Sequence, residues 1–147
     1  MFFISHRGNI HGPDPKKENK IDYINDAISK NFDVEIDLWF EKENFYLGHD
    51  SPENKVDMNF LKNKKLWIHC KNLESFYELS KYDLNFFWHE EDKITITSKG
   101  YFWNFPGTML SKKSICVMPE KSSQNNFDCL GICSDYIKKY YDRYNNI

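Results

Sequence analysis

Short apolar runs alternate with turn-rich or helical segments along the whole chain. Runs of apolar and β-branched residues bounded by turn residues predict strands. These runs cover residues 1–8, 32–40, 43–50, 64–72, 84–92, 93–100, 101–107, 113–120 and 129–135. Apolar residues at helical spacing predict helices over residues 20–31, 73–79 and 134–147. We expect Asn31 to end the first helix in the left-handed conformation.

Strands that end in polar residues, some of them followed by helices, are typical of an α/β protein with a largely parallel sheet. A complete (β/α)8 barrel usually takes about 250 residues, and this chain has 147. After residue 82 the connections are too short for full crossover helices. The pattern therefore predicts one domain over residues 1–147, a reduced TIM-like (β/α) barrel with several helices shortened or missing.

Composition and charge exclude several classes of protein. The net charge is −2, so the chain offers no basic field for nucleic acid, and we interpret the 17% aromatic content as core. No apolar run approaches the roughly 20 residues of a membrane span. A signal peptide is not expected, and the spread of the four cysteines indicates buried free thiols, so we expect a cytoplasmic protein. A thin helical shell would expose apolar strand faces, which favours a homodimer.

Strict alternation in residues 32–40 separates two kinds of side chain. Val34, Ile36 and Leu38 share one face of the predicted strand, and Glu35 and Asp37 share the other. On an edge strand these acids would lie in water, but apolar flanking runs favour a central strand. Buried carboxylates need a partner, and a hard divalent cation bound through oxygen is the natural one.

Titratable side chains recur near the ends of the predicted strands. They are His6 and Arg7, His49, His69 and Lys71, His89, and Glu120. The carboxyl ends of parallel strands are where such folds carry their chemistry. His69 and Lys71 share one face of their strand, and an ammonium group near acids and a cation suits an anionic ligand such as phosphate.

Four short motifs follow one another between residues 6 and 50. They are HRG at 6–8, EN at 18–19, DVEID at 33–37 and GHD at 48–50, with Ala27 in the intervening helix. In this order they resemble the N-terminal signature of the glycerophosphodiester phosphodiesterase family, which belongs to the phosphatidylinositol-specific phospholipase C-like superfamily of TIM barrels. The match covers about half of the chain.

The resemblance implies a metal-dependent phosphodiesterase that cleaves a glycerophosphodiester-like small molecule. His6 and His49 would be the general acid/base pair, and imidazoles suit both roles near neutral pH. Glu35 and Asp37 would bind Mg²⁺ or Ca²⁺, and Arg7 would contact the phosphate. We also place Lys71, His89 and Glu120 among the substrate-binding residues. His69 occupies the position of the family's third acidic ligand, two residues before the lysine, and is a poorer ligand for a hard cation.

Two functions remain open from the sequence. One is the phosphodiesterase, favoured because both histidines, Arg7, Glu35, Asp37 and Lys71 are retained. The other is a catalytically inactive barrel that binds a phosphorylated or sugar-linked ligand, favoured by the His69 replacement and the short C-terminal half. For the phosphodiesterase, the attacking group is either water or a neighbouring hydroxyl of the substrate, which would leave a cyclic phosphate.

Overall fold

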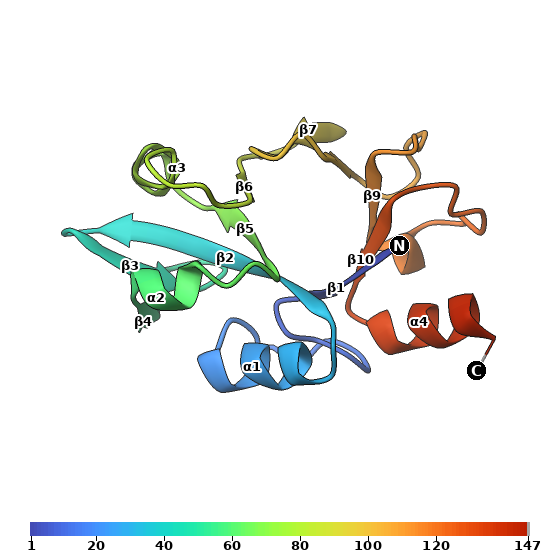
Figure 1. Ribbon diagram of the computed structural model, residues 1–147, viewed down its shortest axis with the longest axis horizontal. Helices are drawn as coiled ribbons and strands as arrows, with labels where there is room; N and C mark the ends of the chain where they lie inside the picture. Colours follow the sequence, from blue (N-terminus) through green and yellow to red (C-terminus); the bar gives the residue numbers. More distant parts are fainter. Residues whose placement is uncertain (147) are drawn as a thin grey trace.

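A computed structural model describes residues 1–146 of the chain (Figure 1). The strands are β1 (Phe2–His6), β2 (Asp33–Glu41), β3 (Asn44–Leu47), β4 (Asn54–Val56), β5 (Leu66–Cys70), β6 (Phe86–Phe87), β7 (Ile94–Ile96), β8 (Phe102–Asn104), β9 (Ser114–Val117) and β10 (Gly131–Ser134). The helices are α1 (Ile21–Ser29), α2 (Met58–Leu61), α3 (Leu73–Leu79), η1 (Pro119–Lys121, a 3₁₀ turn) and α4 (Ile137–Asn145).

The ten strands form one mostly parallel sheet. Parallel pairing runs in the order β6-β5-β2-β1-β10-β9-β8, so the first and last strands of the chain lie side by side near its centre. β2 is long, and its second half leaves this array to pair with β3 in an antiparallel hairpin, to which β4 adds. β7 pairs antiparallel with β8 at the other end. The predicted α/β class with a largely parallel sheet is confirmed.

The sheet is not closed, so the structure does not establish the barrel expected from the sequence. Within residues 1–146, no strand pairing joins β6 to β7 or β8. Single hydrogen bonds connect the segments around β6 and β7. Ser98 N donates to Phe86 O at 2.8 Å, and the Thr95 hydroxyl donates to Trp88 O at 2.8 Å. β6 has only two residues, and both pair with β5.

Helices cover only part of the sheet, as the short connections predicted (Figure 1). α1 packs on β2, α3 packs on β2, β5 and β6, and α4 packs on β1 and β10. Asn72 caps α3 by accepting from Ser75 N at 3.1 Å, and its side chain also bonds both backbone groups of Phe40 in β2. Between β8 and β10, the described chain forms only the 3₁₀ turn η1 and loops outside β9.

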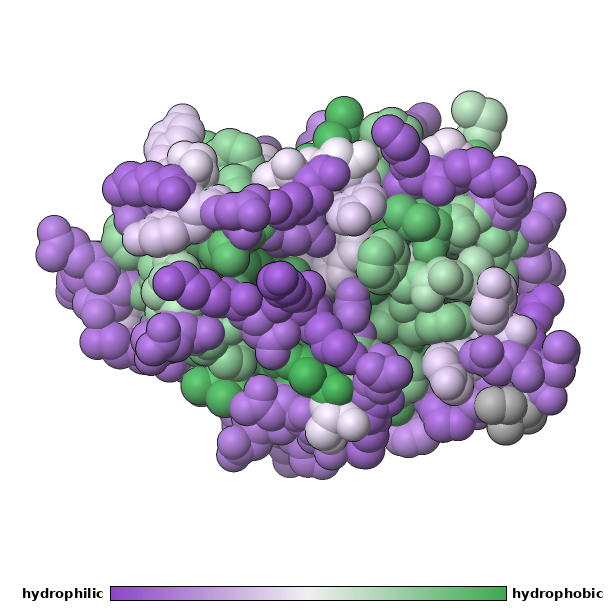
Figure 2. All heavy atoms as spheres, in the orientation of Figure 1, coloured by the Kyte–Doolittle hydropathy of each residue, from purple (hydrophilic) through white to green (hydrophobic). Residues whose placement is uncertain are grey.

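Two apolar clusters lie on the two faces of the sheet. The larger one includes Val34, Ile36 and Leu38 of β2 and packs against the helices. The second is an inner layer to which several strands contribute one residue each: Ile4, Trp67, Phe87, Trp103, Ile115 and Cys133. The rings of Phe87 and Trp103 lie 4.6 Å apart across the open side of the sheet. In Figure 2, hydrophilic residues dominate the outline of one face, and apolar residues show between them mainly on the half that carries β9 and β10.

Most predicted elements have counterparts in the structure. Each predicted strand and helix overlaps an observed one, and Asn31 adopts the expected left-handed conformation with φ 70°. The strand predicted through residue 50 ends at Leu47, and β4, α2 and η1 were not predicted. The last predicted helix begins at Ile137 instead of residue 134, and its final residue lies outside the described part.

The cysteines and the helix lengths agree with two further expectations. Cys70, Cys116 and Cys133 are buried free thiols, and Cys129 is a half-buried one. Among residues 1–146 we find no helix with the length and apolar character needed to cross a bilayer.

Candidate functional site

The polar residues of the site form a layer directly above the inner apolar layer. Side chains two positions apart on a strand share a face, so a residue that follows an inner-layer residue by two points to the same side. The pairs are Ile4 and His6, Trp67 and His69, Phe87 and His89, and Cys133 and Asp135. Apolar residues thus support the polar layer from below, toward the carboxyl ends of the parallel strands.

A cavity of about 750 Å³ opens over this layer. Its charged and titratable lining residues are His6, Arg7, Glu18, Glu35, His49, His69, Lys71, His89, Glu90, Lys121 and Asp135. Apolar residues, among them Trp88, Trp103 and Phe105, line another part of it. All but two of the site residues singled out from the sequence therefore lie around one cavity. Asp37 lies fully buried beside Arg7 and His69, and Glu120 lies in η1, outside the cavity lining.

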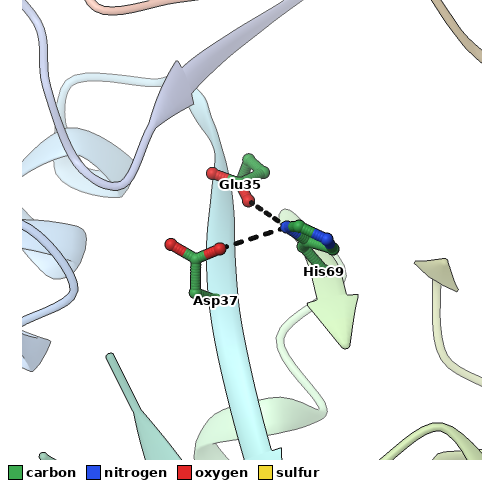
Figure 3. A group of neighbouring side chains, drawn as sticks. All are labelled: Glu35, Asp37 and His69. Carbon is green, nitrogen blue, oxygen red and sulfur yellow. Dashed lines mark hydrogen bonds and ion pairs between the residues drawn. The ribbon is translucent and has the colours of Figure 1, made fainter. Parts of the chain in front are cut away.

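Glu35, Asp37 and His69 form a cluster that could hold a metal ion (Figure 3). One ligand atom from each lies within 4.8 Å of the others. β2 carries the two acids and β5 the histidine, and the register of these parallel strands pairs Asp37 with His69. His69 Nδ1 lies 3.1 Å from Asp37 Oδ1 and 3.9 Å from Glu35 Oε1. Alternation along the strand predicts that Glu35 and Asp37 share one face. Pairing of β2 with both β1 and β5 confirms that this strand is central.

Glu35 is the least compensated acid of the cluster. Its side chain is 3% exposed, and its Oε2 atom has no hydrogen-bond partner among the described residues. Burial, and then the charge of Asp37, raise the pKa of Glu35. A buried carboxylate oxygen without a partner is costly, and a bound cation would remove that cost. The donor set and this unpaired oxygen therefore fit a divalent cation.

Asp37 has partners on both oxygens. Arg7 Nε lies 2.8 Å from Oδ2, and Asn19 Nδ2 donates to the same oxygen at 2.8 Å. On the other side, Lys71 Nζ lies 3.7 Å from Oδ1. Burial by itself would raise the pKa of Asp37, but the hydrogen bond with His69 and the charge of Arg7 outweigh it and hold the pKa well below its usual range. Asp37 is therefore ionised and leaves only Oδ1 for a further ligand.

His6 is held by an acid that the sequence analysis did not single out. Its Nδ1 atom lies 2.7 Å from Asp135 Oδ1, and its Nε2 atom lies 3.8 Å from Glu35 Oε2. Burial lowers the pKa of His6, but the hydrogen bond with Asp135 and the charge of Glu35 outweigh it, so the pKa is raised. Asn9 Nδ2 donates to Asp135 Oδ1 at 2.8 Å and fixes that carboxylate. Because Nδ1 of His6 is hydrogen-bonded to Asp135, Nε2 is the ring nitrogen that faces the cluster of Glu35, Asp37 and His69.

His49 lies at the more exposed side of the cavity. Its side chain is 45% exposed, and Nδ1 lies 2.7 Å from Asp50 Oδ1. The loop is anchored to β2 because Trp39 Nε1 donates to Gly48 O at 2.7 Å and Gly48 N donates to Asp37 O at 3.2 Å. Gly48 has φ 155°, and a Cβ atom there would lie 1.9 Å from Ser51 O, so only glycine fits this turn.

His89 stacks on the metal-cluster histidine. The His69 and His89 rings lie 4.4 Å apart and almost parallel. Burial, and then the positive field of His69, lower the pKa of His89 to about 4. His89 is therefore neutral at physiological pH and provides a flat wall of the cavity, not a charged contact.

Glu120 does not line the cavity, in contrast to the substrate contact expected from the sequence. Both of its carboxylate oxygens accept from the Ser134 hydroxyl at 2.9 Å, and Oε1 accepts from Asp135 N at 3.1 Å. It lies in η1, which follows Met118 in a left-handed conformation, so the chain turns away from the strand direction of β9. These bonds hold the end of β10, and with it Asp135.

Sequence reasoning missed Asp135 and gave no role to Glu18 and Asn19. Glu18 accepts from Asn9 Nδ2 at 2.8 Å and from Arg7 Nη1 at 3.3 Å. Asn19 accepts from Asp37 N at 3.0 Å and so ties the first loop to β2. Asp135 is the final residue of the last predicted strand, and the same strand-end argument that selected His6 would have found it.

No known protein-family model matches the chain, and comparison with curated proteins and with solved structures gave no significant match.

Proposed function

We propose that the protein is a divalent-metal-dependent phosphodiesterase that acts on a glycerophosphodiester-like small molecule. The observation that carries the proposal is the position of His6 next to the Glu35, Asp37 and His69 cluster. The Nε2 atom of His6 thus lies 3.8 Å from Glu35 Oε2, a buried carboxylate oxygen without a hydrogen-bond partner among the described residues. A phosphate oxygen bound at such a cluster would lie within reach of both a proton-transfer group and a cation.

Each residue of the cavity then has a task that follows from its chemistry. When bound, the cation would draw charge from the phosphoryl oxygens. Arg7 and Lys71 bring positive charge to the same side, and the guanidinium Nη groups are suited to phosphate oxygens. His6, held through Nδ1 by Asp135, would move a proton at Nε2. His49 would serve the other alcohol, because it lies on a loop at the exposed side of the cavity.

The resemblance of residues 6–50 to the glycerophosphodiester phosphodiesterase family supports the same conclusion. We propose that the open sheet is a reduced form of that family's barrel, because six strands share one inner apolar layer beneath the site. The resemblance implies Mg²⁺ or Ca²⁺. The imidazole of His69 is a poorer ligand for these hard cations than the acid of the family. The homodimer and the cytoplasmic location expected from the sequence stay predictions.

The test is turnover of a panel of glycerophosphodiesters, including lysophospholipids, with each divalent cation added to metal-stripped protein. We expect release of a phosphomonoester or a cyclic phosphate that requires a cation. Glu35→Gln and Asp37→Asn should abolish it while Asp128→Asn, at an exposed site paired with Lys112, should not. Absence of turnover with every cation and every diester would contradict the proposal.

One observation favours the alternative of a binding module without turnover. Arg7 and Lys71 already lie 2.8 Å and 3.7 Å from the oxygens of Asp37 and compensate its charge without a metal. In that case, glycerol phosphate would bind to metal-free protein, and binding would persist in His6→Asn and His49→Asn. Binding that requires both the cation and Glu35 would count against this alternative.

A further inference from the structure

His69 brings a nitrogen donor to a place where two carboxylates converge. Its side chain is 12% exposed, and Nδ1 is the atom that faces Asp37 Oδ1 and Glu35 Oε1 (Figure 3). The Nε2 atom on the far side of the ring lies 3.3 Å from the backbone oxygen of His89. Nδ1 is also hydrogen-bonded to Asp37 Oδ1 at 3.1 Å. A bound cation would take the place of the proton in this bond, and the ring proton would then lie on Nε2 and be donated to the His89 carbonyl. Hydrogen bonds of this kind fix the tautomer of metal-binding histidines.

Stacking fixes the plane of the same ring. His69 lies nearly parallel to His89, at 4.4 Å between centroids, and to Phe87, at 5.3 Å. Phe87 is 1% exposed and belongs to the inner apolar layer, so the stack rests on the core. The imidazole therefore cannot rotate out of the cluster without breaking both the stack and the bond to the His89 carbonyl. The nitrogen donor is built into the site.

The oxygen donors of the cluster are few. Arg7 and Asn19 occupy Oδ2 of Asp37, so this acid can offer Oδ1, and Glu35 can offer Oε1, the oxygen on the side of His69. Ca²⁺ takes about 6–8 oxygen ligands and Mg²⁺ prefers oxygen in octahedral geometry. Three protein ligands and an open position are the ligand number of catalytic zinc sites. The imidazole among them is a ligand that suits borderline ions, whereas Mg²⁺ and Ca²⁺ are bound through oxygen.

We propose that His69 makes this a site for a borderline transition-metal ion of the Mn²⁺, Co²⁺ and Zn²⁺ class, in preference to Mg²⁺ and Ca²⁺. The inference rests on the metal site of the proposed function and adds the identity of its ion. His69 is then the residue that determines metal selectivity, through a nitrogen ligand that the His89 carbonyl and the aromatic stack hold in place.

The experiment measures metal binding directly, without turnover. Calorimetric titration of metal-stripped protein gives Kd for Co²⁺ and for Mg²⁺ in the wild type, in His69→Gln, in His69→Glu and in His11→Gln, a matched control at an exposed histidine. We expect tighter binding of Co²⁺ than of Mg²⁺ in the wild type. His69→Gln should weaken Co²⁺ binding by at least about 10–100-fold, the range for loss of a group that only supports a ligand, because here a ligand itself is lost, with a smaller change for Mg²⁺. His69→Glu should narrow the gap between the two ions by improving Mg²⁺ binding, and His11→Gln should change neither value.

A second measurement uses wild-type protein, so its result does not depend on whether a variant folds. In wild-type protein labelled with ¹⁵N-histidine and loaded with Mn²⁺, pulsed electron paramagnetic resonance should detect a directly bonded ¹⁵N nucleus. Absence of this coupling, or the same ratio of Co²⁺ to Mg²⁺ affinity in the wild type and in His69→Gln, would overturn the inference.

The outcomes separate this inference from the proposed function. Selective Co²⁺ binding that needs His69, without turnover of any phosphodiester, would contradict the function and support the metal assignment. Turnover with Mg²⁺, together with an affinity ratio that His69→Gln leaves unchanged, would contradict the metal assignment alone. Failure to bind any divalent cation would contradict both.

Discussion

His6 Nδ1 lies 2.7 Å from Asp135 Oδ1, although 129 residues separate the two in the chain. The parallel pairing of β1 with β10 brings them together, because its register matches Ser5 with Ser134 and so sets the next residues of both strands side by side. The side chains meet at the carboxyl ends of both strands. The first and last strands of the chain therefore build one half of the candidate proton-transfer site.

Replacing the carboxylate that holds His6 should affect proton transfer more than binding. In Asp135→Asn the charge that raises the pKa of His6 is lost, so the limb of the pH–rate profile that reports His6 should move to lower pH. We expect kcat to fall by about 10²-fold or more, within the range of general acid–base contributions, with a smaller change in KM. The measurement is a full pH–rate profile, with Asp128→Asn as the control. An unshifted profile would contradict a role for Asp135 through His6.

The contact between His6 and Asp135 should stabilise the folded protein more at low pH than at high pH. The pKa of His6 is raised in the folded state above its ordinary value of 6.5. The stabilisation is therefore fully present below about pH 6.5 and is lost as the pH rises through the folded-state value. The difference in the free energy of unfolding between wild type and Asp135→Asn should be about 1–2 kcal/mol at pH 6 and smaller at pH 9. Urea denaturation of both proteins at several pH values measures this difference. A difference that grows toward pH 9 would contradict the predicted pH dependence.

Glu120 should act on structure, not on substrate. Glu120→Ala removes the acceptor of the Ser134 hydroxyl and of Asp135 N, so we expect a loss of about 1–3 kcal/mol in the free energy of unfolding. Glu120→Gln keeps an acceptor oxygen and should recover part of it. Chemical denaturation and steady-state kinetics together test this. A raised KM with unchanged stability would instead support the substrate contact expected from the sequence.

The two histidines of the proposed acid/base pair should be needed separately. His49→Asn should lower kcat by about 10²–10⁴-fold, as should His6→Asn, because each removes one proton-transfer partner. Thermal stability should change less in His49→Asn, since that side chain is 45% exposed while His6 is 15% exposed. His11→Asn, at an exposed position away from the cavity, is the control. Full activity in His49→Asn would remove this residue from the mechanism.

The sequence by itself determined the strands and the faces of their side chains. Alternation is a property of the extended chain, so Glu35 and Asp37 could be assigned to one face without knowing any partner strand. The apolar runs that flank them predicted a central strand, and β2 pairs on both sides as expected. The left-handed residue Asn31 after α1 is likewise a local property of the chain.

Only the tertiary structure decided which strand ends meet. The contact of His6 with Asp135 depends on the pairing of β1 with β10, and no local pattern encodes a pairing between strands so far apart in the chain. Glu120 ended a predicted strand, yet the turn at Met118 directs it to the end of β10 instead of the cavity. The open edge beside β6 has the same origin, because the pairing of β6 with β5 alone is a relationship between distant segments of the chain.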